Sequence, residues 1–341
     1  MTGINGLKIS GELCLVVLYE DSRGSGLLPA FCRLLAGSQI NMLFLSTESD
    51  AGGTRTTCCV DAAHEALLKS VLRAEPMLQE RAEFTAGVGL LTLFPHRSRL
   101  TLFGRSLRAL TQADLRVFAV ASSVGTLTYV LEYAQLDKAA EVMQACFEFA
   151  GNHAPFKPDL LLRRGPCGGP EASSETKETR AVYWEPQIKT YGFQVVKNLA
   201  LYTYRLPADL PAEWTPAIKR IEDEATRFHL LHAQLRGSFA LDLQLLCEPE
   251  QGAPLTRRIA VEIPAAGDCL LVTAPVELIF FQGPHFGDRF GIADFTFKAL
   301  EEKTDVLLAA VFACASIYLM LPEGAADETR TRLAAAFQTP G

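Results

Sequence analysis

His229 and His232 form an H-x-x-H pair, a spacing that could bring two imidazoles to one metal ion. The residues around them predict a strand, and side chains three positions apart on a strand point to opposite faces. Cys58 and Cys59, neighbours on another predicted strand, diverge for the same reason. We therefore expect no metal or cofactor at either pair, and a partly buried packing role for the histidines.

The common motifs of hydrolytic and phosphoryl-transfer chemistry are missing from the sequence. Ser122 and Ser123 end a predicted strand without a histidine and a carboxylate nearby, and there is no G-x-S-x-G or H-E-x-x-H motif. Gly283, Gly287 and Gly291 are evenly spaced, yet no Lys-Ser/Thr pair follows them as in a phosphate-binding loop. Catalysis would therefore need groups that converge from distant segments.

Composition narrows the class of protein. The 341 residues include 39 acidic and 32 basic side chains, a net charge of −7 that disfavours general nucleic-acid binding. The 49% apolar content excludes a disordered chain, and nine cysteines without C-x-x-C spacing favour a reducing cytoplasm. The N-terminus predicts no signal peptide. The apolar run from Val306 to Leu321 is too short for a membrane helix and predicts two buried strands and a turn, with a re-entrant segment as the alternative.

The elements that must position any functional residue recur along the chain. Residues 88–94 predict a strand, and apolar side chains at i, i+3, i+7 and i+10 from Leu100 to Leu110 mark one face of a helix. A hairpin and a second helix follow, which gives the order β-α-β-β-α. The same order begins again at Leu13 and at Val276.

A fourth copy, beginning near residue 195, is weaker. Residues 195–205 predict a strand and residues 228–246 a hairpin. Its second helix is doubtful, because Pro249, Gly252 and Pro254 interrupt the region, and Arg257–Ile263 read as a strand instead.

The repeat predicts an α+β fold of four ferredoxin-like βαββαβ modules, arranged as two tandem pairs. We place the modules at residues 10–85, 86–150, 191–272 (atypical) and 273–338. Residues 151–190, rich in glycine, proline and polar side chains, form the predicted linker between the pairs.

The strand, glycine-containing loop and helix resemble ACT domains, most closely the paired regulatory ACT domains of aspartate kinases. Residues 276–300 carry the best match, and Ser38–Glu48 and Phe94–Gly104 are similar to segments of the same family. The Lys-Phe-Gly-Gly phrase that opens the kinase domain of that family is missing, and the first module begins near Leu13. The resemblance therefore implies a stand-alone amino-acid sensor that is not an enzyme, forms a homo-oligomer, and acts on an enzyme of amino-acid biosynthesis.

In ACT domains the amino-acid effector sits where two modules meet, at the loop after the first strand and at the start of the second strand. Such a loop offers N–H groups at a helix N-terminus, which suit a carboxylate. The resemblance implies three sets of ligand-binding residues here. They are His285, Phe286, Gly287, Asp288, Arg289, Gly291, Asp305 and Val306 in the fourth module; Asp21, Ser22, Arg23, Gly24, Asn41 and Met42 in the first; and His96, Arg97, Ser98, Arg99, Arg116 and Val117 in the second.

Other interpretations of these residues stay open. Asp21–Gly24 and the Arg97–Arg99 loop are equally compatible with solvated turns. The modules could also be a ligand-free scaffold for homodimerisation or for binding a biosynthetic enzyme. A third hypothesis is an enzyme that uses a cleft between the two pairs.

Overall fold

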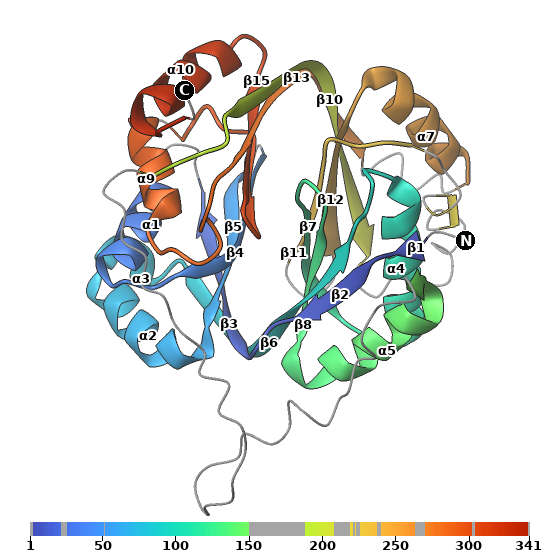
Figure 1. Cartoon of the computed structure of the whole chain (residues 1–341), viewed down its shortest axis with the longest axis horizontal. Coiled ribbons are helices and arrows are strands. Elements are labelled where there is room, and N and C mark those ends of the chain that lie inside the picture. Colours follow the sequence, from blue (N-terminus) through green and yellow to red (C-terminus); the bar gives the residue numbers. More distant parts are fainter. Residues whose placement is uncertain are drawn as a thin grey trace, which may run out of the picture.

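One large antiparallel sheet dominates the mixed α/β fold. The computed structural model describes residues 3–21, 26–50, 52–149, 188–207, 219–220, 222, 226–236, 240–262, 270–301 and 304–339. The strands of the sheet follow the order β2-β6-β3-β5-β4-β14-β15-β13-β10-β12-β11-β7-β8, and a further pairing of β6 with β8 closes the sheet on itself (Figure 1). The predicted linker 151–190 lies outside the described residues except for residues 188–190.

Residues 13–88 form a first β-α-β-β-α-β unit. Its elements are β3 (Leu13–Glu20), α1 (Leu27–Gly37), β4 (Met42–Asp50), β5 (Gly53–Asp61), α2 (Glu65–Ala74), the short α3 (Pro76–Gln79) and the beginning of β6 (Ala82–Phe94). The beginning of β6 pairs with β3, and from Val88 onward the same strand pairs with β8 (Leu127–Glu132). One continuous strand therefore runs across the predicted boundary at residues 85/86.

The second segment continues from β6 through α4 (Leu100–Gln112), β7 (Val117–Ser122), β8 and α5 (Leu136–Cys146). The N-terminal strand β2 (Gly6–Ile9) adds to the outer part of β6. A separate two-stranded sheet pairs β1 (Gly3–Ile4) with β9 (Glu148–Phe149). The N-terminus thus completes the sheet around residues 88–149.

The C-terminal half repeats this plan. It comprises β10 (Phe193–Pro207), β11 (Leu230–Arg236), β12 (Ala240–Cys247), α7 (Pro249–Glu262), β13 (Leu270–Gln282), α9 (Ile292–Ala299), β14 (Ala309–Ala313), β15 (Ser316–Pro322) and α10 (Ala326–Ala336). The strands β14 and β15 fall in the apolar run from Val306 to Leu321, as the sequence predicts. β13 crosses the predicted boundary at residues 272/273 and pairs with both β10 and β15.

Helices cover the outside of the closed sheet in two groups (Figure 1). We call the part covered by α1, α2, α3, α9 and α10 the α1 half, and the part covered by α4, α5 and α7 the α4 half. Each group of helices packs on its own hydrophobic cluster, and a third cluster fills the interior between the halves. Strands such as β14 and β15 are buried on both faces and are almost continuously apolar. Cys58 lies under the helices and Cys59 in the interior, which confirms their opposite faces.

Strands far apart in the sequence also pair, in addition to the neighbouring segments that β6 and β13 join. β4 pairs with β14, from Phe44 with Ala313 to Glu48 with Ala309, and α1 packs against α9. On the other side β7 pairs with β11. The first and last segments therefore share one helix layer, and the predicted arrangement of the modules as two tandem pairs is not confirmed.

The prediction of a strand at Arg257–Ile263 is wrong, because α7 covers residues up to Glu262. Leu255 and Ile259 lie one turn apart on its buried face, so apolar burial stabilises the helix despite the internal Pro254. Gly252 is needed at this place, since a Cβ there would collide with the ring of Tyr202.

Candidate ligand-binding seam

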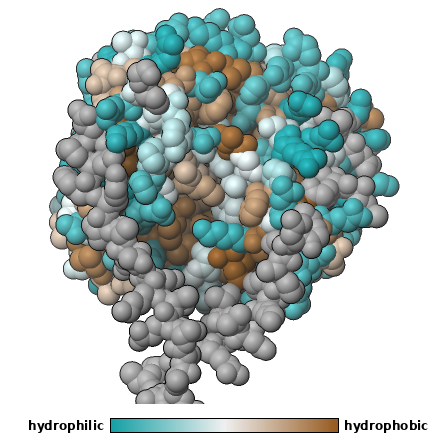
Figure 2. Space-filling model, viewed as in Figure 1, coloured by the Kyte–Doolittle hydropathy of each residue, from teal (hydrophilic) through white to brown (hydrophobic). Residues whose placement is uncertain are grey.

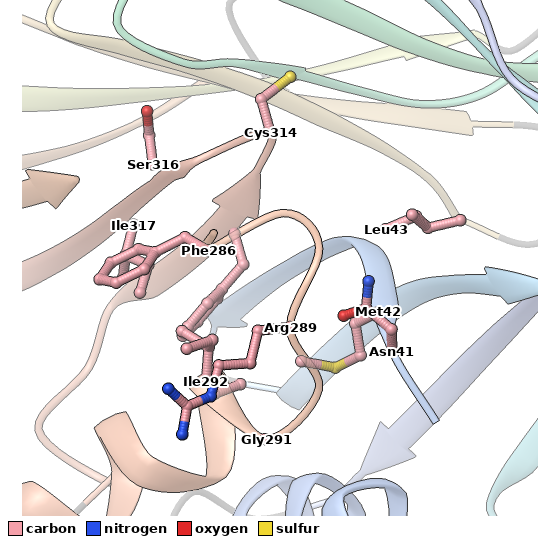
Figure 3. A pocket seen from close by; sticks show the side chains of 12 residues that line it. Asn41, Met42, Leu43, Phe286, Arg289, Gly291, Ile292, Cys314, Ser316 and Ile317 are labelled. Carbon is pink, nitrogen blue, oxygen red and sulfur yellow. The ribbon is translucent and has the colours of Figure 1, made fainter. Parts of the chain in front are cut away.

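The start of β4 and the loop between β13 and α9 meet at a narrow seam (Figure 3). Five of the predicted ligand-binding residues border one small cavity there: Asn41, Met42, Phe286, Arg289 and Gly291. We call this the seam cavity. The sequence did not single out its other lining residues, which are Leu43, Ile292, Ala293, Phe312, Cys314, Ser316 and Ile317.

Aromatic packing and a glycine fix the loop. The ring of Phe286 is buried and lies edge-on to Phe281, with the centroids 6.0 Å apart. Gly283 permits this fold of the loop, because a Cβ at that position would collide with the Phe286 ring and with the carbonyl oxygen of Lys189. The backbone N–H groups of Asp288 and Arg289 both donate to the carbonyl oxygen of His285, at 3.1 and 3.0 Å.

One hydrogen bond closes the seam. The side-chain amide of Asn41 donates to the carbonyl oxygen of Gly287 at 2.8 Å, across 246 positions of sequence. The seam cavity measures about 20 Å³, which is room for a single water molecule. In this conformation the seam is a closed contact between two segments and does not hold an amino acid.

Gly287 takes part in the seam through its bond to Asn41, whereas the remaining described residues predicted in the first and fourth modules do not line the seam cavity. His285 and Asp288 are exposed, Asp305 is exposed, and Val306 packs against the cluster under the helices. The strand predicted from Asp305 begins at Ala309. Asp21 forms an exposed ion pair with Arg81 at 3.4 Å. Ser22, Arg23 and Gly24 lie outside the described residues.

In the second predicted site, His96 has a structural role. Its Nε2 bonds the carbonyl oxygen of Ser123 at 2.6 Å, and its Nδ1 accepts from the backbone N–H of Ser98 at 2.7 Å. The ring stacks on Phe228 with centroids 5.1 Å apart, and burial lowers its pKa. Both nitrogens are therefore occupied, and the ring is neutral.

The arginines of the second predicted site do not line the seam cavity. Arg97 and Arg99 are exposed in the loop before α4. Arg116 lies over the ring of Phe118, 5.1 Å from its centroid, and Val117 begins β7. The structure thus gathers a cavity from the first and fourth sets of residues, and not from the second.

The interior between the halves contains a polar network that the sequence analysis missed. Thr57 donates to Gln234 at 2.5 Å, and Gln234 donates to Ser46 at 3.2 Å. His232, fully buried, bonds Ser46 through Nδ1 at 3.0 Å and Gln244 through Nε2 at 2.6 Å. His229 instead bonds Glu248 at 2.8 Å, so the two histidines have separate partners.

Buried charges continue this network toward one end of the interior. Arg55 pairs with Glu48 and lies 3.3 Å from Asp242, which also pairs with Arg205 and Arg236. Burial raises the pKa of Glu48 to about 7 and outweighs the attraction of Arg55, while Asp242 adds to the rise. One sequence pattern indicates this network: polar side chains two positions apart on a strand, such as Ser46 and Glu48, lie on the same face of the sheet.

Within the described ranges, no group of three or more His, Cys, Asp or Glu side chains could hold a metal ion. In the same part of the chain, no helix has the length and apolar character to cross a bilayer.

No protein-family model matches the sequence, and no curated protein matches it. Among solved structures, an aspartate kinase from Synechocystis matches 99% of this chain with a TM-score of 0.76 and 12% identity. The chain spans 58% of the length of that kinase. Regulatory subunits of aspartate kinase from Thermus thermophilus and Thermus flavus match 42% and 43% of this chain and 99% and 100% of their own, with TM-scores of 0.38 and 0.39 and identities of 13% and 14%.

The match to the Synechocystis enzyme shows that the chain shares a fold with an aspartate kinase. The expected likeness to aspartate kinases is confirmed at this level. The prediction that the chain is not an enzyme is contradicted, because the protein whose structure matches 99% of this chain is an enzyme.

Proposed function

We propose that the chain has an amino-acid-sensing regulatory role and is built of four ACT-like modules. In this proposal residues 10–85 pair with residues 273–338, and residues 86–150 pair with residues 191–272. The repeated element order and the fold shared with an aspartate kinase support it. The observation that carries it is the seam, where a helix-capping loop and the start of a distant strand meet through Asn41 and Gly287.

The seam offers complementary chemistry for an amino acid. Arg289 borders the cavity and can pair with a carboxylate, next to the N-terminus of α9, where Gly291 is the cap residue. The amide of Asn41 can accept from an ammonium group once it leaves Gly287. Because the cavity holds only a water molecule, the ligand binds when the loop moves away from β4. Ligand would thereby select an open arrangement of the two segments.

A panel of the twenty amino acids in a thermal-shift assay tests this role. We expect one of them to raise the melting temperature saturably, since a ligand that binds only the folded protein stabilises it. Arg289→Gln should weaken that ligand about tenfold or more, whereas Arg73→Gln on an exposed face of α2 should leave it unchanged. An unchanged melting temperature with all twenty amino acids would contradict the sensing role.

A second candidate is a ligand-free scaffold that homodimerises or binds a biosynthetic enzyme. The closed seam, with its volume of about 20 Å³, favours this candidate. Light scattering of the purified protein with and without amino acids distinguishes the two. A dimer mass unaffected by every amino acid supports the scaffold, and a ligand-dependent mass supports the sensor.

A further inference from the structure

A second cavity, of about 590 Å³, opens between the α1 half and the α4 half of the closed sheet. We call it the interhalf cavity. Its lining shares no residue with the seam cavity. On the face of the molecule in Figure 2, hydrophobic side chains are visible in the middle, between the two halves. The volume falls within the roughly 300–1,000 Å³ typical of ligand pockets.

The course of β6 creates this space. The strand pairs with β3 up to Val88 and with β8 beyond it, so the two halves diverge from this point. The register between β3 and β6 shifts between Leu13 and Leu15, a β-bulge at which Gly87 has a φ of 69°. Bulges interrupt the regular ladder and occur often beside binding sites. The backbone of residues 86–88 thereby forms part of the cavity wall.

The floor of the interhalf cavity is apolar. Leu15, Val88 and Phe118 belong to the interior cluster, and Val17 and Leu235 pack against it. An apolar ligand chain that covers this floor would be stabilised in proportion to the apolar surface that it removes from water.

The rim of the cavity carries two carboxylates and one guanidinium. Glu83 stands on β6, and Glu132 ends β8, where it pairs with Val88 further along the same β6 strand. Neither glutamate forms an ion pair within the part of the chain that the structure describes. Arg116 lies on the ring of Phe118. The charged residues that line the cavity therefore sum to −1 and include two acceptors for a cation.

We propose that the interhalf cavity binds a small organic amine, whose ammonium group pairs with Glu132 or with Glu83 and whose apolar chain covers the floor between them. A charge-assisted hydrogen bond to one of these carboxylates supplies orientation, and the floor supplies the apolar contact. Simple alkylamines and amino acids share this ammonium chemistry. Arg116 would add a contact only for a ligand that also has a carboxylate. The site is independent of the seam and does not rest on the sensing role proposed above.

Calorimetric titration of the full chain with four probes of similar length tests the proposal. Pentylamine and norleucine carry the ammonium group, whereas pentanol and hexanoate lack it. We expect saturable binding of pentylamine and no binding of pentanol or hexanoate. Tighter binding of norleucine than of pentylamine, lost in Arg116→Gln, would identify an amino acid as the natural class. If neither pentylamine nor norleucine binds in the titration, the proposal is overturned.

Charge-removing variants locate the binding. Either Glu83→Gln or Glu132→Gln should weaken pentylamine about tenfold or more, which identifies the carboxylate that binds the ammonium group, and Ala86→Trp should block access to the cavity. The matched control Glu141→Gln, on an exposed face of α5, and the seam variant Arg289→Gln should leave pentylamine binding unchanged. Binding that survives both Glu83→Gln and Glu132→Gln would overturn the site, whatever the result of the amino-acid panel on the seam.

Discussion

At the scale of single residues, the strongest interactions between the halves are buried and charged. Removing a charge from water is costly unless hydrogen bonds and an opposite charge replace the lost hydration. Arg55 meets this demand by donating to the carbonyl oxygen of Leu235 at 2.9 Å while it pairs with Glu48 and Asp242. The compensation is incomplete for both residues, because within the described part of the chain Oε2 of Glu48 and Nε of Arg55 have no hydrogen-bond partner. These residues make the contact between the halves sensitive to protonation.

Glu48 should make the folded protein less stable as the pH rises. Its pKa is raised from 4.5 to about 7, so its contribution is fully favourable below pH 4.5 and is lost as the pH rises through 7. The loss is on the order of 3 kcal/mol. Urea unfolding at pH 5 and pH 8 should therefore show a smaller decline for Glu48→Gln than for the wild type. An identical decline in both proteins would contradict the raised pKa.

His232 should act in the opposite direction. Burial lowers its pKa to about 4, so its contribution is fully present above pH 6.5 and is lost as the pH falls through 4. Between pH 6.5 and pH 4 we expect His232→Gln to lose less stability than the wild type, measured as the shift of the urea midpoint. An identical decline in His232→Gln and in the wild type would contradict the lowered pKa of His232.

At the scale of elements, glycines decide how closely helices approach the sheet. Gly252 in α7 lies against Tyr202, whereas Gly37, at the end of α1, has open space where a Cβ would lie. Both are in helices, so alanine would improve helix propensity at each by up to about 1 kcal/mol. Only at Gly252 does a collision oppose that gain.

The two alanine substitutions should therefore have opposite signs. We expect Gly252→Ala to destabilise the protein by about 1–3 kcal/mol, because the Tyr202 ring must move in a packed core. Gly37→Ala should be neutral or stabilising. Thermal unfolding of both variants measures the difference, and a stabilised Gly252→Ala would show that α7 packs less closely than the structure indicates.

The helices and strands could largely be predicted from the sequence, because apolar spacing sets their type. Burial of the second face of the strands could not be predicted. His232 and Gln234 are polar residues two positions apart on β11, a pattern typical of a solvent-facing strand face, and only closure of the sheet buries them. The pairing of β4 with β14 could not be predicted, since a strand edge presents only backbone groups and does not specify its partner. For the same reason the sequence located Asn41 and Arg289 but not their shared cavity.

At the scale of the whole molecule, the closed sheet joins the halves into one core. Met320 is fully buried in the interior cluster, which draws side chains from both halves. Separate unfolding of the α1 half would expose this cluster, so we infer that the halves unfold together.

Met320→Ala should weaken both halves equally. The cavity would cost about 2–5 kcal/mol, and amide hydrogen exchange in β4 and in β12 should accelerate by the same factor. Leu67→Ala, at a side chain that is 44% exposed, should leave both unchanged. Faster exchange confined to β4 would contradict a shared core.

The pairing of β4 with β14 also has a consequence for synthesis. The edge of β4 is complete by Asp50, but its partner begins at Ala309, about 260 residues later. At roughly 5–20 residues per second, the ribosome needs about 13–50 s to supply that partner. During this time the unpaired backbone edge of β4 is open to other chains. We expect the nascent protein to depend on chaperones that shield this edge until translation reaches its last strands.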